Sequence, residues 1–416
     1  MNINKFGGAS VKSANGVKNL AKIVEEKIPN GIVVVSALGK TTNNLEKLVK
    51  AIYQEQKSDF SQTLNEIKSY HIEIMNRLFN SNHTIFEEIG DIFINLEDKF
   101  SLDTKDFDFL YDQVVSYGEL LSTRIVSAYL ETIGLTNEWV DIREQIITDK
   151  VFREAILDWK TSRINIKKRF DYYKKLYITQ GFISGTNDGL TTTLGREGSD
   201  YTAAILANSL DAKAVTIWKD VPGVLNADPR YFKNPVKIDK ISYQEAIELA
   251  YYGAKIIHPK TIKPLQNKGI ALFVKSFLEP DKEGTLIAEF PAYHEDKPIF
   301  ILKKKQVLIS IIPKDFSFVF EEVMSEIYSL FADYRIKVNL IQNSAINFTV
   351  CVDEGNSRVH KLIEELKSNY KVLFNKGLEL ITVRHYNEKS LETLLKGRNV
   401  LVEQRSRHTA QFVIEE

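Results

Sequence analysis

The chain has 416 residues, and its 55 lysines and arginines balance 55 aspartates and glutamates. That length is typical of ~2 to 3 domains, and the lack of net charge gives no electrostatic reason to expect nucleic acid or an anionic membrane as a partner. No apolar run approaches the ~20 residues that a bilayer-spanning helix needs, and the first residues contain no signal-peptide core. We therefore expect a soluble, intracellular protein, placed in the cytoplasm. The single cysteine, Cys351, excludes an intramolecular disulfide and a cysteine-based metal site, and its apolar surroundings favour a packed, inert thiol.

The chain begins with two strand–loop–helix units. Residues 3–6 are predicted to form a strand, followed by a glycine loop, Gly7-Gly8-Ala9-Ser10, and an amphipathic helix through about residue 26. Residues 32–35 are apolar and β-branched, which is typical of a strand buried on both faces of a parallel sheet. Polar residues 36–43 follow, ahead of a helix. Because open α/β sheets bind ligands at the carboxyl ends of their strands, these loops are candidate binding segments.

Residues 58–133 are expected to be helical almost throughout, and they contain the sequence Ser116-Tyr117-Gly118-Glu119. Taken alone, a glutamate such as Glu119 on a helix is ordinarily solvated. Further strands are predicted at residues 139–141 and 176–183.

A second glycine loop follows a strand predicted at residues 191–194. It reads Gly195-Arg196-Glu197-Gly198-Ser199-Asp200, and an apolar helical pattern begins directly after it. Two interpretations are open: an anion-binding loop at a helix N-terminus, or a plain turn capped by Ser199 or Asp200. The first glycine loop favours ligand binding.

The rest of the N-terminal part completes a doubly wound α/β pattern. A strand at residues 214–218 ends in a charged, turn-rich loop, and Ser242 is expected to cap a helix through residue 251. His258, between an apolar pair and a proline, is interpreted as a structural, hydrogen-bonded histidine in preference to a catalytic base. Neither glycine loop is a Walker A or a dinucleotide-binding sequence, which argues against a P-loop NTPase and a Rossmann dehydrogenase.

A linker is predicted at residues 290–298, which divides the chain into domains 1–290 and 298–416. Beyond it, the expected order is strand 306–312, helix 316–331, strands 338–344 and 347–352, helix 358–370 and strand 371–374. This is the βαββαβ order of ferredoxin-like α+β units. A second, shorter unit follows to residue 415, and residues 299–302 could complete its sheet. Two small, half-exposed sheets in tandem favour partners, hence a homodimer or a dimer-based homo-oligomer.

Five motifs, in order along the chain, together resemble the aspartokinase family of the amino-acid kinase fold. They are Lys5-Phe6-Gly7-Gly8-Ala9-Ser10-Val11, Ser116-Tyr117-Gly118-Glu119, Gly195-Arg196-Glu197-Gly198-Ser199-Asp200, Asp220-Val221-Pro222-Gly223 with Asp228-Pro229-Arg230, and Gly253-Ala254-Lys255-Ile256-Ile257-His258-Pro259. The C-terminal part resembles the paired ACT domains of that family, which bind effector amino acids. The resemblance implies phosphorylation of the side-chain carboxylate of L-aspartate by MgATP, giving 4-phospho-L-aspartate on the route to lysine, threonine and methionine.

By the same resemblance, catalytic roles fall on Lys5, Lys255 and Asp200. The phosphate cradle and the nucleotide side comprise Gly7, Gly8, Ser10, Lys219, Asp220 and Arg230. On the aspartate side, Arg196 would hold the α-carboxylate and Glu119 the ammonium, and the site is further lined by Ser36, Thr42 and Ser199. The family often carries a tyrosine where this chain has Leu225, so no adenine contact is assigned there.

The residue types suit this chemistry. An ionised carboxylate is already a nucleophile, so the reaction needs positioning and charge neutralisation more than a strong base. Mg²⁺ is expected to arrive with the nucleotide, because no dedicated protein cage for a metal is visible.

An effector site is expected in the first ACT unit, with contacts from Asn339, Asn343, Ser344 and Ile346. In lysine-sensitive family members, acidic residues in this segment meet the effector's amines, whereas this chain has Asn339 and Ala345 there. The resemblance therefore implies weaker lysine inhibition, with threonine or no effector as alternatives. Two other functions are alternatives: an inactive amino-acid-binding regulator, and another amino-acid kinase such as acetylglutamate or glutamate 5-kinase. The first is disfavoured by the intact motifs, and the second by the combination of the Glu119 motif with paired ACT units.

Overall fold

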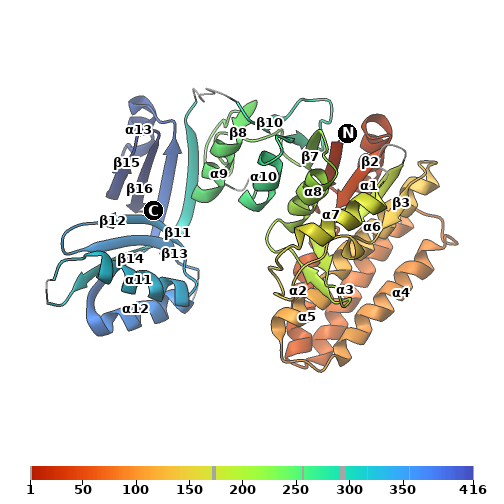
Figure 1. Cartoon of the computed structure of the whole chain (residues 1–416), viewed down its shortest axis with the longest axis horizontal. Coiled ribbons are helices and arrows are strands. Elements are labelled where there is room, and N and C mark those ends of the chain that lie inside the picture. Colours follow the sequence, from red (N-terminus) through yellow and green to blue (C-terminus); the bar gives the residue numbers. More distant parts are fainter. Residues whose placement is uncertain are drawn as a thin grey trace. The chain divides into compact units, whose positions relative to one another are not determined.

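The structure is a computed structural model, and it describes residues 2–170, 175–254, 257–290, 297–315, 317–355 and 357–415 (Figure 1). The chain divides into two compact units. Unit 1 consists of Met1–Val224, Lys237–Ile247 and Ile256–Pro291, and unit 2 of Leu225–Val236, Glu248–Lys255 and Ala292–Glu416. Most of the predicted linker lies outside the described residues, so the boundaries at 290 and 298 stay a prediction. Within the described residues, no helix is long and apolar enough to cross a membrane.

Unit 1 is built on an eight-stranded sheet in the order β3-β4-β2-β1-β7-β9-β10-β8. The strands are β1 (Asn2–Phe6), β2 (Gly31–Val35), β3 (Glu138–Val140), β4 (Leu176–Gln180), β7 (Ala214–Lys219), β8 (Lys240–Ser242), β9 (Ala271–Ser276) and β10 (Thr285–Ala288). All neighbours are parallel except β9 and β10. Residues 32–35 are fully buried, as their apolar run predicts. The doubly wound, mainly parallel sheet is confirmed.

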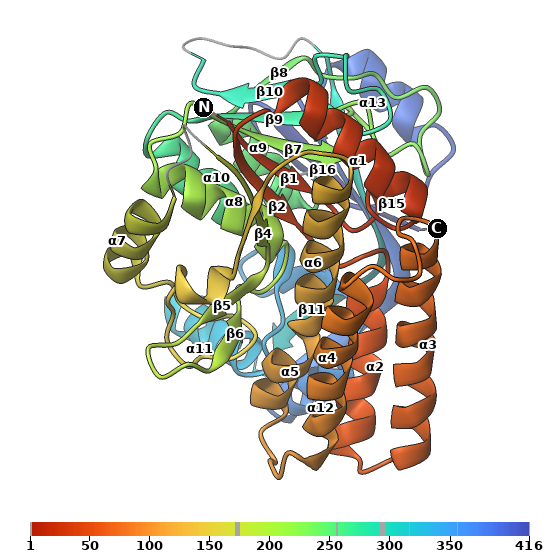
Figure 2. The same cartoon turned by 90° about the vertical axis from the view of Figure 1, so that its right-hand side faces the viewer.

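Helices surround this sheet, and five of them, α2 to α6, gather as a bundle (Figure 2). The helices from the N-terminus to α10 are α1 (Ala14–Lys27), α2 (Thr41–Tyr53), α3 (Lys57–Asn76), α4 (Ile85–Glu97), α5 (Phe107–Val115), α6 (Tyr117–Thr132), α7 (Trp159–Arg169), α8 (Gly198–Ser209), α9 (Tyr243–Tyr252), which continues into unit 2, and α10 (Pro259–Gln266). Two short 3₁₀ turns, η1 (Asp98–Ser101) and η2 (Ile142–Glu144), accompany them. The first helix begins at Ala14 because Ser13 caps it, accepting a hydrogen bond from the Gly16 N–H. The apolar sides of α1 to α6 form one large core.

The strand predicted at residues 176–183 was wrong in one respect, because it breaks into two. β4 ends at Gln180, and β5 (Ile183–Gly185) leaves the main sheet to pair antiparallel with β6 (Thr191–Thr193). Phe182, at the break, has a φ of 69°. The Thr192 hydroxyl contacts those of Ser184 and Thr148, 2.9 and 2.6 Å away. The second glycine loop thus follows a polar hairpin and not a strand of the parallel sheet.

Unit 2 contains one six-stranded antiparallel sheet in the order β12-β13-β11-β14-β16-β15. Its elements are β11 (Ile299–Pro313), α11 (Glu321–Asp333), β12 (Val338–Asn343), β13 (Phe348–Asp353), α12 (Ser357–Asn369), β14 (Tyr370–Arg384), α13 (Glu388–Leu395), β15 (Val400–Arg405) and β16 (Thr409–Glu415). The first half has the predicted ferredoxin-like order. Ile299 pairs with Arg384, which confirms that residues 299–302 complete the second half. The prediction of two separate sheets was wrong, however, because β11 and β14 each run through both halves of one sheet.

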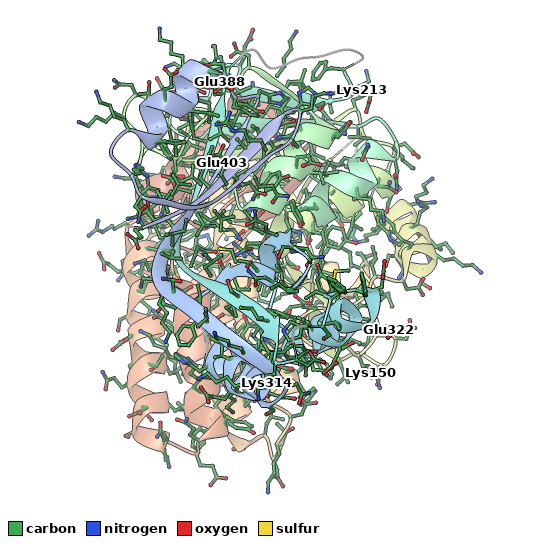
Figure 3. All side chains as sticks on the ribbon, turned by 90° about the vertical axis from the view of Figure 1, so that its left-hand side faces the viewer. Lys150, Lys213, Lys314, Glu322, Glu388 and Glu403 are labelled. Atoms are coloured by element: carbon green, nitrogen blue, oxygen red, sulfur yellow. The ribbon has the colours of Figure 1, made fainter. Side chains whose placement is uncertain are left out.

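Two helices of unit 2 carry acidic residues in their first turns. The first of them begins at Glu321 and not at 316, since Glu321 and Glu322 occupy its first turn, where negative charge is favourable. Glu322 and Glu388, which lie in the first turns of α11 and α13, are labelled in Figure 3. Both are exposed.

Three small cores stabilise the six-stranded sheet. One lies against α11 and α12, a second against α13, and a third on the opposite face of the sheet, where Leu308 and Cys351 meet Leu380 and Val413. Cys351 is fully buried, and burial raises the pKa of its thiol to about 12. The expectation of a packed, inert cysteine is confirmed.

Candidate active site

The first two loops of unit 1 meet backbone to backbone at the carboxyl ends of β1 and β2. The Ser36 N–H donates to the Phe6 carbonyl at 3.1 Å, and the Gly39 N–H donates to the Gly8 carbonyl at 3.0 Å. A Cβ added to Gly8 would lie 2.6 Å from the Ala37 carbonyl oxygen, so a larger residue would force the loops apart. The glycine is therefore required by the approach of the second loop.

Lys5 and Ser10 lie close to Gly7. The Lys5 Nζ atom lies 3.6 Å from the position of a Cβ on Gly7. The Ser10 N–H donates to the Gly7 carbonyl at 3.0 Å. The Ser10 hydroxyl is buried and has no hydrogen-bond partner within the described part of the chain. A buried hydroxyl without a partner, beside an ammonium and a glycine backbone, suits an anionic ligand such as a phosphate.

Three charged side chains meet at the start of α8. The Lys5 Nζ atom lies 2.7 Å from Asp200 Oδ1, and Lys219 Nζ lies 3.9 Å from Asp200 Oδ2. Burial alone would raise the pKa of Asp200, but Lys5 and Lys219 outweigh it and hold the pKa below its ordinary value. Two ammonium groups around one carboxylate leave an excess positive charge, which a bound anion would neutralise.

Ser199 lies in the same helical turn as Asp200. Its hydroxyl accepts a hydrogen bond from the Ser36 hydroxyl at 3.0 Å. A Cβ on Gly181 would lie 2.4 Å from Ser199 Cβ, so only a glycine at this position leaves room for the first turn of α8. The cap of the helix is Glu197, with a φ of 54°. The turn capped by Ser199 or Asp200 is therefore wrong, because both residues lie inside the first helical turn.

Glu119 is buried, in contrast to the solvated position typical of its sequence context. It is 3% exposed in the first turn of α6, and its Oε1 accepts a hydrogen bond from the Ala37 N–H at 3.1 Å. Its Oε2 is buried without a hydrogen-bond partner among the described residues. Burial raises the pKa of Glu119 to about 8, and Lys5 is close enough to lower it slightly.

The remaining candidates are more dispersed. Arg196 is exposed in the loop after Gly195, Thr42 is half-buried in the first turn of α2, and Asp220 is exposed beyond β7. Arg230 belongs to unit 2, where it pairs with Asp228. Lys255 lies outside the described residues. The structure thus gathers around Lys5 the following residues: Gly7, Gly8, Ser10, Glu119, Asp200 and Lys219.

The candidate effector residues lie at one end of the unit 2 sheet. The Asn339 carbonyl accepts from Lys303 Nζ at 2.8 Å, and its amide donates to Gln306 and Asp353 at 2.9 and 3.1 Å. Further along β12, Asn343 and Ser344 are exposed, and Ile346 is 39% exposed. Asn339 is thus held by its own sheet, whereas the loop after it is open.

One residue that contacts both loops has no signal in the sequence. The Tyr70 hydroxyl, on α3, donates to the Lys12 carbonyl at 2.7 Å. A Cβ on Gly39 would lie 2.5 Å from the same hydroxyl. Nothing in the pattern of a long amphipathic helix distinguishes this tyrosine from its neighbours.

A cleft of about 370 Å³ lies elsewhere in unit 1, between α4, α6, β3 and η2. Its lining includes Tyr117, Leu120 and Arg124, which share a face of α6 that turns away from Glu119. None of the candidate residues lines it. Within the described ranges, no group of three or more acidic, histidine or cysteine side chains could hold a metal ion.

Comparisons with known proteins identify the family of the chain. The model of the amino acid kinase family matches residues 1–276. The lysine-sensitive aspartokinase 3 of Escherichia coli is 32% identical, over 92% of this chain and 86% of that protein. Aspartokinase 1, chloroplastic, of Arabidopsis thaliana is 31% identical, over 95% of this chain and 69% of that protein.

Solved structures show the same likeness. The crystal structure of E. coli aspartokinase III in complex with aspartate and ADP matches with a TM-score of 0.85 and 30% identity, covering 100% of this chain and 96% of that one. The complex of the same enzyme with lysine and aspartate matches with a TM-score of 0.84, 30% identity and the same coverage, 100% and 96%.

We predict that Glu119→Gln removes a pH dependence of stability. Between about pH 4.5 and 8 the unfolded chain loses this proton while the folded protein keeps it, so folding becomes less favourable as pH rises through that window. Glutamine keeps the acceptor for the Ala37 N–H and cannot ionise. The midpoint of thermal unfolding should match wild type at pH 5 and exceed it at pH 8.

The matched control is Glu87→Gln, an exposed residue in the first turn of α4. It should leave the wild-type pH profile unchanged. A Glu119→Gln midpoint that differs from wild type by the same amount at every pH would contradict the raised pKa.

Proposed function

The chain belongs to the amino acid kinase family and, within it, to the aspartokinases, and on that basis we propose how its residues carry out the reaction. The protein is an aspartate kinase, which phosphorylates the side-chain carboxylate of L-aspartate with ATP. The observation that carries the proposed roles is the buried group of Lys5, Asp200 and Lys219 beside the Gly7–Gly8 loop.

On the phosphate side, Lys5 and Ser10 are the donors that an anionic group would meet first. Gly7 and Gly8 let the phosphates approach the backbone closely, and Lys5 is placed to neutralise charge as it shifts during transfer. Asp200 holds Lys5 in place, because the two lie 2.7 Å apart in a buried site. Mg²⁺ bound to the nucleotide would supply further charge neutralisation; Asp200, between two ammonium groups, is not free to hold a metal by itself.

On the aspartate side, recognition divides between two charges. The exposed guanidinium of Arg196 can hold the α-carboxylate bidentately, and the unpartnered Oε2 of Glu119 can receive the ammonium. With a pKa of about 8, Glu119 is mostly protonated in the free site at neutral pH, so pairing with the ammonium releases its proton. By resemblance, Ser36, Thr42 and Ser199 are assigned to the lining of the aspartate site, and the hydrogen bond between the Ser36 and Ser199 hydroxyls supports the two serines.

The nucleotide side is assigned by resemblance to Lys219, Asp220 and Arg230. Lys219 is supported by its ion pair with Asp200, 3.9 Å away. Lys255 keeps its proposed catalytic role, and it lies outside the described residues. A cytoplasmic location belongs to the same proposal, in keeping with a chain whose single cysteine is a buried thiol.

Regulation by an amino acid is proposed for the loop after β12. One of the crystal structures of E. coli aspartokinase III is a complex with lysine and aspartate. In this chain the Asn339 carbonyl already accepts from the Lys303 ammonium, so a second cation would have to displace it. This occupancy supports weak lysine binding, while the exposed residues Asn343, Ser344 and Ile346 are proposed to meet an effector's α-groups.

We predict that Arg196→Ala lowers kcat/KM for aspartate by roughly 30- to 1000-fold, the equivalent of about 2 to 4 kcal/mol for a partner charge left unpaired. The KM for ATP should stay within about twofold. A coupled ATPase assay with and without aspartate measures both. Arg77→Ala, which removes an exposed arginine from the end of α3, is the control. Unchanged aspartate kinetics would remove Arg196 from the site.

We predict that lysine inhibits only weakly and that Asn339→Asp increases the sensitivity. The substitution adds one negative charge to a cluster that now holds Lys303 and Asp353. Activity is measured against series of lysine, threonine and methionine. Full inhibition of the wild type by micromolar lysine would show that a neutral amide suffices here.

We also propose a homodimer, or a larger oligomer built on dimers, held through unit 2. Phe318 and Phe320, just before α11, are 57% and 62% exposed, and large exposed aromatic side chains are favoured at interfaces. Light scattering should give at least twice the chain mass, and Phe318→Ser with Phe320→Ser should shift it towards the monomer. Ile94→Ser, which removes a side chain of similar exposure (58%) in unit 1, should not.

A further inference from the structure

A buried carboxylate lies beneath the second glycine loop. Asp112, on α5, is fully buried. Its Oδ2 accepts hydrogen bonds from the backbone N–H groups of Arg153 and Thr193, both at 2.9 Å, and its Oδ1 accepts one from the Thr193 hydroxyl at 2.7 Å. One side chain therefore joins two segments that are far apart along the chain.

Those two segments lie against each other just before Arg196. The Ala155 N–H donates to the Thr193 carbonyl at 3.0 Å. The Arg153 carbonyl lies 3.1 Å from the position of a Cβ on Gly195. Arg153 has a φ of 70°, a left-handed conformation that is strained for a residue other than glycine and needs external support. Gly195 has a φ of 76°, which glycine adopts without that strain. Asp112 provides that support at the base of the loop.

The same helix also leads to the other half of the substrate site. Gln113, the next residue, donates to the Thr191 carbonyl at 2.7 Å, so α5 holds both ends of β6. α5 then passes through Ser116 directly into α6, whose first turn contains Glu119. A short helical segment therefore fixes the distance between the loop of Arg196 and the carboxylate of Glu119.

We propose that Asp112 is a positioning residue for aspartate recognition. It does not touch the substrate. Through Thr193 and Arg153 it places the Arg196 loop relative to Glu119, so that the α-carboxylate and the ammonium are bound at the separation they have in one amino acid. This inference rests on the roles proposed above for Arg196 and Glu119. Nothing in it involves the phosphate cradle at Gly7 and Gly8.

The test compares three substitutions at this position. Asp112→Ala leaves the buried N–H of Thr193 and the partly buried N–H of Arg153 without this acceptor and should raise the KM for aspartate roughly 10- to 100-fold, since small misplacements far from the reacting atoms cost that much. Asp112→Asn can still accept both N–H groups and donate to the Thr193 hydroxyl, so it should stay within about threefold of wild type. The KM for ATP should change by no more than about twofold in either.

Asp112→Glu covers the case in which the alanine variant does not fold. It keeps the charge and both acceptors and moves them by one methylene, so the aspartate KM should rise with the ATP KM unchanged. Asp108→Ala is the control: this exposed residue of the same helix contacts the Arg153 side chain and not its backbone. It should leave both KM values within about twofold.

Hydrogen exchange supplies a readout without activity. The amides of Arg153 and Thr193 should exchange faster in Asp112→Ala, and the amide of Ala37, which donates to Glu119, should not change. The proposal would be overturned if Asp112→Ala raised the KM for aspartate and the KM for ATP equally, or if Asp112→Asn raised the KM for aspartate as much as Asp112→Ala. Either result would show a general structural role.

Combining Asp112→Ala with Arg196→Ala distinguishes a failure of this inference from a failure of the role proposed for Arg196. Because both substitutions act on one interaction, the fold-loss of kcat/KM for aspartate in the double variant should be smaller than the product of the two single fold-losses. If Arg196→Ala alone has no effect on aspartate, the role of Arg196 fails. If Arg196→Ala has its effect and Asp112→Ala has none, positioning by Asp112 is wrong.

Discussion

The buried ion pair between Lys5 and Asp200 is the constraint on which the catalytic half of the molecule depends. Removing an ion from water costs several kcal/mol, and an opposite charge at hydrogen-bonding distance offsets that cost only in good geometry. Here β1 delivers Lys5, α8 delivers Asp200, and Lys219 follows from β7, so three elements of the sheet and its helices must be in register before the charges can meet. The excess positive charge that remains is tolerable because the site is built to receive an anion.

The close packing of the loops follows from this constraint. Gly8, Gly181 and Gly198 each lie where a Cβ would press on a neighbouring loop or helix, so the polypeptide can surround Lys5 and Asp200 without inserting a side chain. Glu119 enters the same region as a carboxyl group that burial keeps largely protonated, which avoids a second buried negative charge beside Asp200. The buried atoms without a hydrogen-bond partner among the described residues include Ser10 Oγ and Glu119 Oε2, both of which belong to the candidate site.

The sequence predicts the parallel sheet well, because runs such as 32–35 are short, apolar and β-branched, as strands buried on both faces are. It predicts the hairpin of β5 and β6 poorly, since a run of threonines fits either a sheet or a polar hairpin. Glu119 has the pattern of a solvated residue, and only the packing of Gly118 against Ala37 explains its burial. Tyr70 and Asp112 carry no pattern at all, because their partners, which are mainly backbone groups, are distant in sequence. The motif residues could be named by resemblance, whereas the groups that hold them in place could not.

The two long strands of unit 2 determine how that unit can be divided. β11 and β14 pair with each other along both halves of the six-stranded sheet, from Ile299 with Arg384 to Pro313 with Tyr370. Neither half is therefore a module that evolution or a protein engineer could excise. A chain cut after α12 would lose β14, expose the hydrogen-bonding edge of β11 over its full length and uncover the core around Leu308. The gene segments for the two halves are expected to be gained or lost together.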